Sequence, residues 1–237
     1  MIQIEHIYKQ FGKMEVLHDV ELHFRKGEAI ALIGPNGCGK TTLIKSILRM
    51  VLPTKGTIFF EGKDISVSGD QYRRNIGYMP QIGRYPDNMQ IGQVIETIQS
   101  LRSDILNVDD ELIYSYQLKQ LYHKRMSTLS GGTRQKVSAV IAFLFNPDVL
   151  ILDEPTAGLD PIASEILKEK ILSARNKGKL IVITSHLLAE LDELISEVVF
   201  MQDGRVQFHK KVDDLKSDEG TISLSKAISN YLKRGVA

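Results

Sequence analysis

The feature that most constrains this chain is an apolar run that leads directly into a glycine-rich turn. Residues 29–33 (AIALI) show no polar alternation, which is the pattern of a strand buried on both faces of a parallel sheet. The next residues, 34–42 (GPNGCGKTT), fit the pattern G-x-x-x-x-G-K-[ST], and helical apolar spacing follows from Lys40 to Met50. A strand, a turn that can surround a phosphate and a helix, in this order, predict a nucleotide-binding site in an α/β domain.

Each residue type in the turn has a chemical reason to be there. Glycines let successive backbone N–H groups face one anion, and the helix that starts at Lys40 adds the positive end of its dipole. The Lys40 ammonium is expected to reach the β- and γ-phosphates of a bound nucleotide, and the Thr41 hydroxyl to bind Mg²⁺. The predicted phosphate-binding residues are Gly34, Pro35, Asn36, Gly37, Cys38, Gly39, Lys40, Thr41 and Thr42.

The single cysteine, Cys38, lies inside this turn. It can form no internal disulfide, which fits a reducing cytosol. Two interpretations of its place stay open. A thiol within an anion-binding turn can be reactive until a nucleotide covers it, or Cys38 can be a small residue at a position that tolerates several side chains.

Composition and charge exclude several classes of protein. Thirty basic residues against 29 acidic ones give a net charge of +1, without the basic excess of most nucleic-acid binders. The longest apolar stretch, residues 137–145, is far shorter than the roughly 20 residues that span a bilayer. The N-terminal residues do not have the basic and apolar regions of a signal peptide. We therefore expect a cytoplasmic protein that has no nucleic-acid partner.

Two further segments carry groups suited to phosphate chemistry. Residues 149–154 (VLILDE) predict a buried strand whose last carboxylate, Asp153, can reach Mg²⁺ at the carboxyl edge of the sheet. Glu154, one residue later, is placed to orient or deprotonate a water molecule, and helix capping is the alternative for this pair. In residues 129–136 (LSGGTRQK), Ser130 and two glycines precede a predicted helix, either as hydrogen-bond donors or as a plain N-cap.

Together these three segments resemble the ATP-binding subunit of ABC transporters, over nearly the whole chain. Leu129–Thr133 matches the LSGGQ signature of that family, with Thr133 where glutamine is usual. Alternating strands and helices already indicate a parallel α/β sheet interrupted by helices. The resemblance implies an α/β, P-loop NTPase (RecA-like) core at 1–81 and 146–209 with an N-terminal antiparallel β subdomain. It also implies an inserted α-helical subdomain at 82–145 and a C-terminal helical tail at 210–237.

The resemblance also implies further site residues. Phe11 stands where an aromatic ring stacks on adenine; a core role is the alternative, and Tyr8 is a second candidate for the stacking. Gln81 matches the Q-loop, Asp160 the D-loop and His186 the switch histidine. The catalytic residues are then Glu154, His186, Gln81 and Lys40, and the Mg²⁺ ligands are Thr41, Gln81 and Asp153.

The implied assembly is a head-to-tail dimer that encloses two ATP molecules. In it, Ser130, Gly131 and Gly132 of one chain close over the ATP held by the other, with Asp160 nearby. The resemblance implies a partner built of multi-span membrane permease subunits, which hold the protein at the inner face of the cell membrane. Their predicted contact is Ile82–Gln93, where Arg84 and Tyr85 are expected to be exposed.

A narrower resemblance concerns the transported substrate. Residues 78–86 and 129–137 are similar to the ATPase of the copper-site maturation system for nitrous oxide reductase. The histidines do not form a copper-binding cluster in the sequence, so any metal specificity is expected in the partner subunits. The alternative function is a soluble ABC ATPase that acts as a switch or scaffold without transport.

Overall fold

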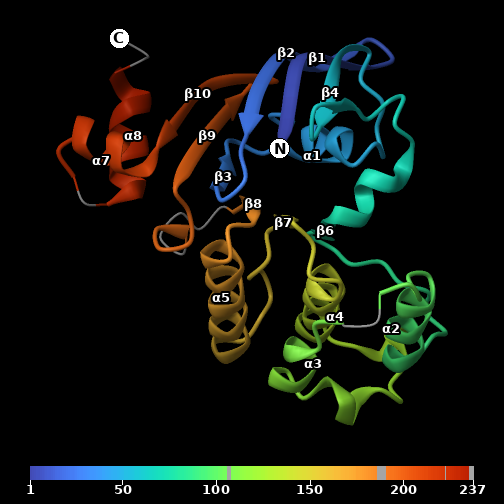
Figure 1. The fold of residues 1–237 in the computed structure, drawn as a ribbon. Coiled ribbons are helices and arrows are strands. Elements are labelled where there is room, and N and C mark those ends of the chain that lie inside the picture. The colour runs from blue at the N-terminus through green and yellow to red at the C-terminus, as the bar shows by residue number, and fades with distance from the viewer. Residues whose placement is uncertain (106–107, 186–190, 222, 235–237) are drawn as a thin grey trace.

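The computed structural model describes residues 1–105, 108–185, 191–221 and 223–234. Its centre is a six-stranded sheet in the order β10-β9-β3-β8-β7-β6 (Figure 1). All neighbours in this sheet are parallel except β10, which pairs antiparallel with β9. The strands are β3 (Ala29–Ile33), β6 (Ile76–Met79), β7 (Val149–Asp153), β8 (Leu180–Thr184), β9 (Glu197–Gln202) and β10 (Arg205–Lys211). The predicted parallel α/β core is confirmed.

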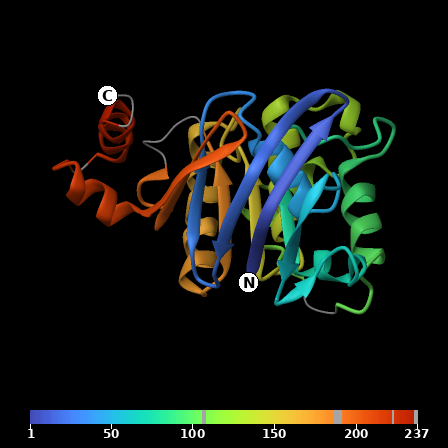
Figure 2. The ribbon, with the colours of Figure 1, turned by 90° about the horizontal axis from the view of Figure 1, so that it is seen from above.

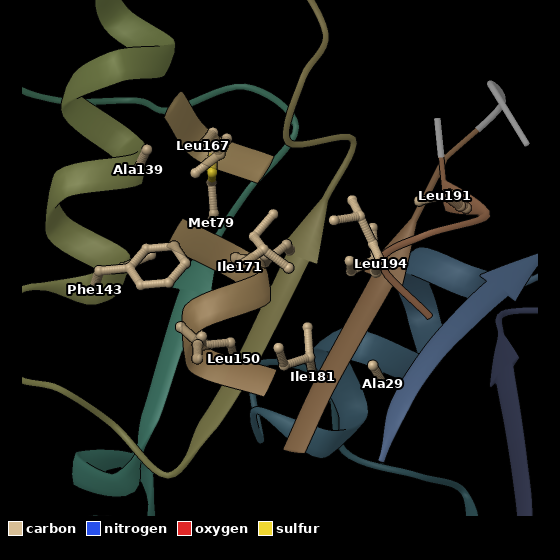
Figure 3. Close-up of a cluster of buried hydrophobic side chains, with 14 of the residues drawn as sticks. Ala29, Met79, Ala139, Phe143, Leu150, Leu167, Ile171, Ile181, Leu191 and Leu194 are labelled. Atoms are coloured by element: carbon tan, nitrogen blue, oxygen red, sulfur yellow. The ribbon is translucent and has the colours of Figure 1, made fainter. Parts of the chain in front are cut away.

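Successive residues of the central strands point into two separate cores, which explains why these strands are apolar throughout. Ala29, Ala31 and Ile33 of β3 belong to one core, and Ile30 and Leu32 belong to the other. Figure 3 shows part of the first core. Met79 and Leu150 of the sheet lie near Phe143 of α4 (Gly131–Phe143) and near Leu167 and Ile171 of α5 (Pro161–Asn176). Ala29 lies on the other side of the view, near Ile181 and Leu194.

The second core lies between the central sheet and an antiparallel sheet at the N-terminus. This sheet has the order β2-β1-β4-β5, and helix α1 (Lys40–Ile47) packs into the same core. Its strands are β1 (Ile2–Phe11), β2 (Met14–Phe24), β4 (Lys55–Phe60) and β5 (Lys63–Asp64). The predicted antiparallel subdomain is therefore present, and it covers the side of the central sheet opposite to α4 and α5 (Figure 1).

The helical part of the chain forms the lower right of Figure 1. It contains α2 (Ile91–Ser100), α3 (Glu111–Ser115) and α4, with short 3-10 turns at Leu118–Leu121 and Met126–Thr128. Another 3-10 turn, Asp70–Asn75, precedes β6. Helix α4 packs against β6, so this part is joined to the edge strand of the central sheet.

Two helices end the chain, α7 (Val212–Asp218) and α8 (Leu224–Arg234), and Figure 2 shows them at one end of the molecule. The amphipathic spacing predicts the second of them and its docking on the domain. Tyr231 packs edge-on against Phe208 of β10, with ring centroids 4.6 Å apart. Within the described ranges, no helix is both long enough and apolar enough to cross a bilayer.

Candidate functional site

A cleft of about 690 Å³ lies at the carboxyl ends of β3, β6 and β7. It gathers residues from β1, β2, the glycine-rich turn, α1 and the segments that follow β6 and β7. The lining residues are Phe11, Met14, Val16, Asn36, Gly37, Gly39, Lys40, Thr41, Thr42, Gln81, Asp153 and Glu154. Ligands of open α/β sheets bind at this edge. Segments more than a hundred residues apart in the sequence thus meet in one cleft, as their predicted roles require.

The glycine-rich turn is held between β2 and β9 with little free space. A Cβ at Gly34 would lie 2.0 Å from the carbonyl oxygen of Met201, and one at Gly39 would lie 2.8 Å from Cδ2 of Leu17. Gly39, the N-cap of α1, also has φ of 105°, in the left-handed region that favours glycine. Gly34 and Gly39 are therefore required by packing as well as by the phosphate that this turn is predicted to bind, whereas a Cβ at Gly37 would meet nothing within 4 Å.

Lys40 folds back over the turn. Its Nζ donates hydrogen bonds to the carbonyl oxygens of Gly34 (2.7 Å) and Pro35 (3.0 Å). The positive charge is thereby held against the turn at the wall of the cleft. An anion entering the cleft meets this ammonium together with the N-terminus of α1.

The thiol of Cys38 faces away from the solvent. The residue is 4% exposed, belongs to the core beneath the antiparallel sheet, and places its Sγ 3.8 Å from Nζ of Lys40. Because reagents reach a buried thiol poorly, this position favours the second interpretation, a small residue that fills the space behind the turn.

The two carboxylates after β7 are set by contacts with the neighbouring strand β8. Asp153 is buried, and it accepts a hydrogen bond from the hydroxyl of Thr184, its partner across the parallel pair. Glu154 then leaves the strand with φ of 53°, and its N–H donates to both the carbonyl and the hydroxyl oxygen of Thr184, each at 3.1 Å. The change of backbone direction separates the two carboxylates, although both line the cleft. No pattern in the sequence points to Thr184, because its pairing with Asp153 spans 31 residues.

Gln81 follows β6 and is exposed at the cleft. Nearby, burial raises the pKa of Tyr78 to about 12, with a further contribution from the charge of Asp153, so this phenol stays protonated at neutral pH. The Thr41 hydroxyl, the Asp153 carboxylate and the Gln81 side-chain oxygen share the cleft. These hard oxygen ligands suit Mg²⁺.

Ser130, Gly131 and Gly132 do not line the cleft. Ser130 caps α4, since its Oγ accepts a hydrogen bond from the N–H of Thr133 at 3.2 Å, which matches the N-cap alternative. Gly131 is exposed and has space around its Cα, so this helix N-terminus remains open to solvent. Within one chain the structure therefore does not bring these residues to the glycine-rich turn.

Asp160 also lies outside the cleft lining, where it caps α5 by accepting a hydrogen bond from the N–H of Ala163 at 2.8 Å. Lys136 donates a hydrogen bond to Asp160, with Nζ and Oδ2 2.7 Å apart, and this bond lowers the pKa of the Asp160 carboxyl group. The predicted switch residue His186 lies outside the described residues.

Comparisons with known proteins decide the family. The model of the family described as ABC transporter matches residues 17–157. The chain belongs to this family. It is 33% identical to the lantibiotic transport ATP-binding protein SrtF of Streptococcus pyogenes, over 98% of this chain and 97% of that protein. It is 30% identical to the Nod factor export ATP-binding protein I of Ralstonia nicotianae, over 92% of this chain and 70% of that protein.

Solved structures agree with this assignment. A structure of the ATP-binding subunit of an ABC transporter has a TM-score of 0.88 and 28% identity, and the match covers 97% of this chain and 98% of that one. A post-hydrolysis dimer of the ATP-binding cassette MJ0796, 22% identical with a TM-score of 0.78, shows the same fold. Because ATP-binding domains of ABC transporters hydrolyse ATP, this ABC protein is an ATPase.

Proposed function

We propose that this ABC ATPase binds ATP in the cleft at the glycine-rich turn and, as a head-to-tail dimer, drives transport by separate membrane subunits. One observation carries the proposal. The turn, Gln81, Asp153 and Glu154 share the cleft, whereas the donors at 130–132 lie outside it, with Ser130 and Gly131 exposed. A second copy of the chain supplies the missing donors if its α4 N-terminus covers this cleft. The structural neighbour MJ0796 is itself described as a dimer.

The residues of the cleft fit an in-line hydrolysis. The oxygen of a water molecule forms a bond to the γ-phosphorus, the bond from that phosphorus to the β–γ bridging oxygen breaks, and ADP leaves. The Glu154 carboxylate accepts the proton of the attacking water. Lys40 and the N–H groups of the turn stabilise the charge on the phosphates, and Gln81 and His186 complete the proposed catalytic set.

Magnesium fits the same cleft. Thr41, Asp153 and Gln81 would hold the ion, and Thr184 keeps the Asp153 carboxylate oriented through its hydroxyl. Bound Mg²⁺ supplies positive charge that neutralises the phosphates as the bond to the leaving ADP breaks.

We propose Phe11 as the adenine platform in preference to Tyr8. Phe11 lines the cleft and is 47% exposed, whereas Tyr8 is not among the lining residues. Lys9 places its Nζ 4.7 Å from the centre of the Phe11 ring.

Replacing Phe11 by alanine is expected to weaken ATP binding about 5-fold, because stacking of one base on an aromatic ring contributes on the order of 1 kcal/mol or more. Titration with a fluorescent ATP analogue measures the dissociation constant. Tyr8→Ala is the matched control and should bind ATP as the wild type does. Equal effects of the two substitutions would contradict the assignment to Phe11.

The proposed membrane contact at 82–93 needs one correction. Arg84 is exposed as predicted, but Tyr85 is half-buried, and its hydroxyl lies 2.9 Å from Oγ of Ser138 on α4. Tyr85 packs against the core because the segment turns back onto α4 there. We therefore assign the exposed contact to Arg84 and Ile82, which is 64% exposed. We keep the predicted domain limits in this proposal. They are a core at 1–81 and 146–209, a helical subdomain at 82–145 and a C-terminal helical tail at 210–237.

Arg84→Glu is expected to weaken association with the membrane subunits several-fold, since a charge at the rim of an interface mainly changes the rate of association. The measurement is the amount of multi-span subunit that co-purifies with the tagged ATPase from native membranes. Lys63→Glu, an exposed charge reversal on β5, is the control. Absence of any membrane subunit from the wild-type preparation would favour the soluble switch or scaffold.

We propose that the transport driven by this ATPase serves maturation of the copper site of nitrous oxide reductase. The resemblance at 78–86 and 129–137 supports it. The two relatives named above are a lantibiotic transport protein and a Nod factor export protein, so one ATPase fold serves different cargoes. Deleting the gene should leave the reductase without its full copper content, and an unchanged copper content would contradict the proposal.

A further inference from the structure

Gln135, on the second turn of α4, is a polar side chain buried within the protein. It is 5% exposed, and its Nε2 donates hydrogen bonds to the carbonyl oxygens of Glu154 at 3.3 Å and Pro155 at 3.4 Å. Buried amides are kept where they satisfy specific partners, because an unpaired one is costly. Here the partners belong to the backbone that carries the proposed catalytic base.

That backbone adopts a conformation that needs support. Glu154 has φ of 53°, in the left-handed region that residues with a Cβ seldom occupy. The N–H of Glu154 donates hydrogen bonds to Thr184, and the carbonyl oxygen of Glu154 accepts one from Gln135. Such a conformation persists only where surrounding contacts enforce it, and here two different elements do so.

Helix α4 is fixed to the same loop at two more points. A Cβ on Gly132 would lie 2.6 Å from the carbonyl oxygen of Gly158, so the helix meets the loop at backbone distance. One turn further along α4, Lys136 pairs with Asp160. Residues 130–136 and 154–160 thus form one packed unit. Its first half carries the donors proposed for the partner's ATP, and its second half carries the base for the chain's own ATP.

We propose that Gln135 is a positioning residue for hydrolysis, which fixes the direction of the Glu154 carboxylate by holding its backbone. Gln135 does not line the cleft, so it acts through Glu154 and not on the nucleotide. The same hydrogen bonds connect Glu154, the proposed base for the chain's own ATP, to α4, whose N-terminus is proposed to cover the ATP bound by the partner. The inference rests on the proposed function, because it requires Glu154 to act in hydrolysis.

The decisive variant is Gln135→Leu, which nearly preserves the side-chain volume and removes both donor hydrogens. A catalytic group displaced by about 1 Å can cost on the order of 100-fold in rate, so kcat should fall roughly 10- to 100-fold. KM for ATP should change by less than about twofold, because Gln135 does not line the cleft and the substitution leaves Lys40 and the glycine-rich turn unchanged. Gln120→Leu, an exposed glutamine in the helical part, is the matched control. A folded Gln135→Leu protein with kcat within about twofold of the wild type overturns the proposal.

A second experiment separates positioning from a general role in folding. In a Glu154→Gln background, adding Gln135→Leu should cause no further loss of single-turnover rate, since two residues that act through one group are not additive. The double variant should still form a dimer with ATP in size-exclusion chromatography. A fully additive loss, or loss of that dimer, would show that Gln135 shapes another part of the protein.

Two precautions keep the outcome interpretable. If Gln135→Leu does not fold, Gln135→Asn replaces it under the same criteria, because it keeps the amide but is one methylene too short to reach the carbonyls. Failure of the proposed function is recognised separately, as a wild type without ATPase activity or a Glu154→Gln variant with full activity. Failure of this inference leaves both of those controls normal and changes only the behaviour of Gln135→Leu.

Discussion

Replacing Glu154 by glutamine is expected to lower steady-state ATP turnover by roughly 10²- to 10⁴-fold, the usual contribution of a general base. Glutamine has nearly the same shape, but its amide cannot accept the proton of the attacking water. The backbone of residue 154 should be unaffected, because its hydrogen bonds to Thr184 and Gln135 involve only main-chain atoms of Glu154. ATP should therefore still bind, and the dimer should persist because the nucleotide is not consumed.

Phosphate release measures the rate, and size-exclusion chromatography with and without ATP measures the dimer. Glu169→Gln, an exposed position on α5, is the control for a surface Glu→Gln substitution and should behave as the wild type. If Glu154→Gln hydrolyses ATP at a rate within about threefold of the wild type, Glu154 is not the base. A variant that neither binds ATP nor dimerises would instead point to a structural role for the carboxylate.

The sequence predicted the central sheet well because its strands carry a simple signal. Residues 29–33, 149–152 and 180–183 are apolar on both faces, and the structure buries each of them between two cores. The N-terminal strands gave a weaker pattern. The pairing of β1 with β2 is irregular near His6 and Asp19, which both have positive φ, so the alternation of apolar and polar residues is broken there.

The cleft was predictable for a different reason. Asp153 ends β7, and Lys40 and Thr41 begin α1 directly after the turn that follows β3; the ends of parallel strands meet at one edge of the sheet. What the sequence did not show were contacts between distant elements. Tyr85 was expected to be exposed, yet its hydroxyl meets Ser138 on α4, 53 residues later. The hydrogen bonds of Gln135 are likewise visible only once α4 is placed beside the loop after β7.

Replacing Lys40 by alanine is expected to weaken ATP binding about 100-fold, equivalent to roughly 3 kcal/mol, because hydrogen bonds to charged groups are the strong ones and a phosphate would lose its nearest cation. In the structure Nζ of Lys40 already lies against the turn, 2.7 Å from the carbonyl oxygen of Gly34. The loss should be larger than for Phe11→Ala, since stacking on adenine does not neutralise charge.

Isothermal titration with ATP measures the affinity, and a thermal melt shows whether the turn has collapsed. The melt is needed because Lys40→Ala also removes the two hydrogen bonds that Nζ donates to the turn. Lys45→Ala removes an exposed lysine from the same helix and should leave ATP binding unchanged. Both variants lower the net charge by one, so they differ only in the position from which the positive charge is removed. Equal affinities for the two variants would mean that the anion does not bind at this turn.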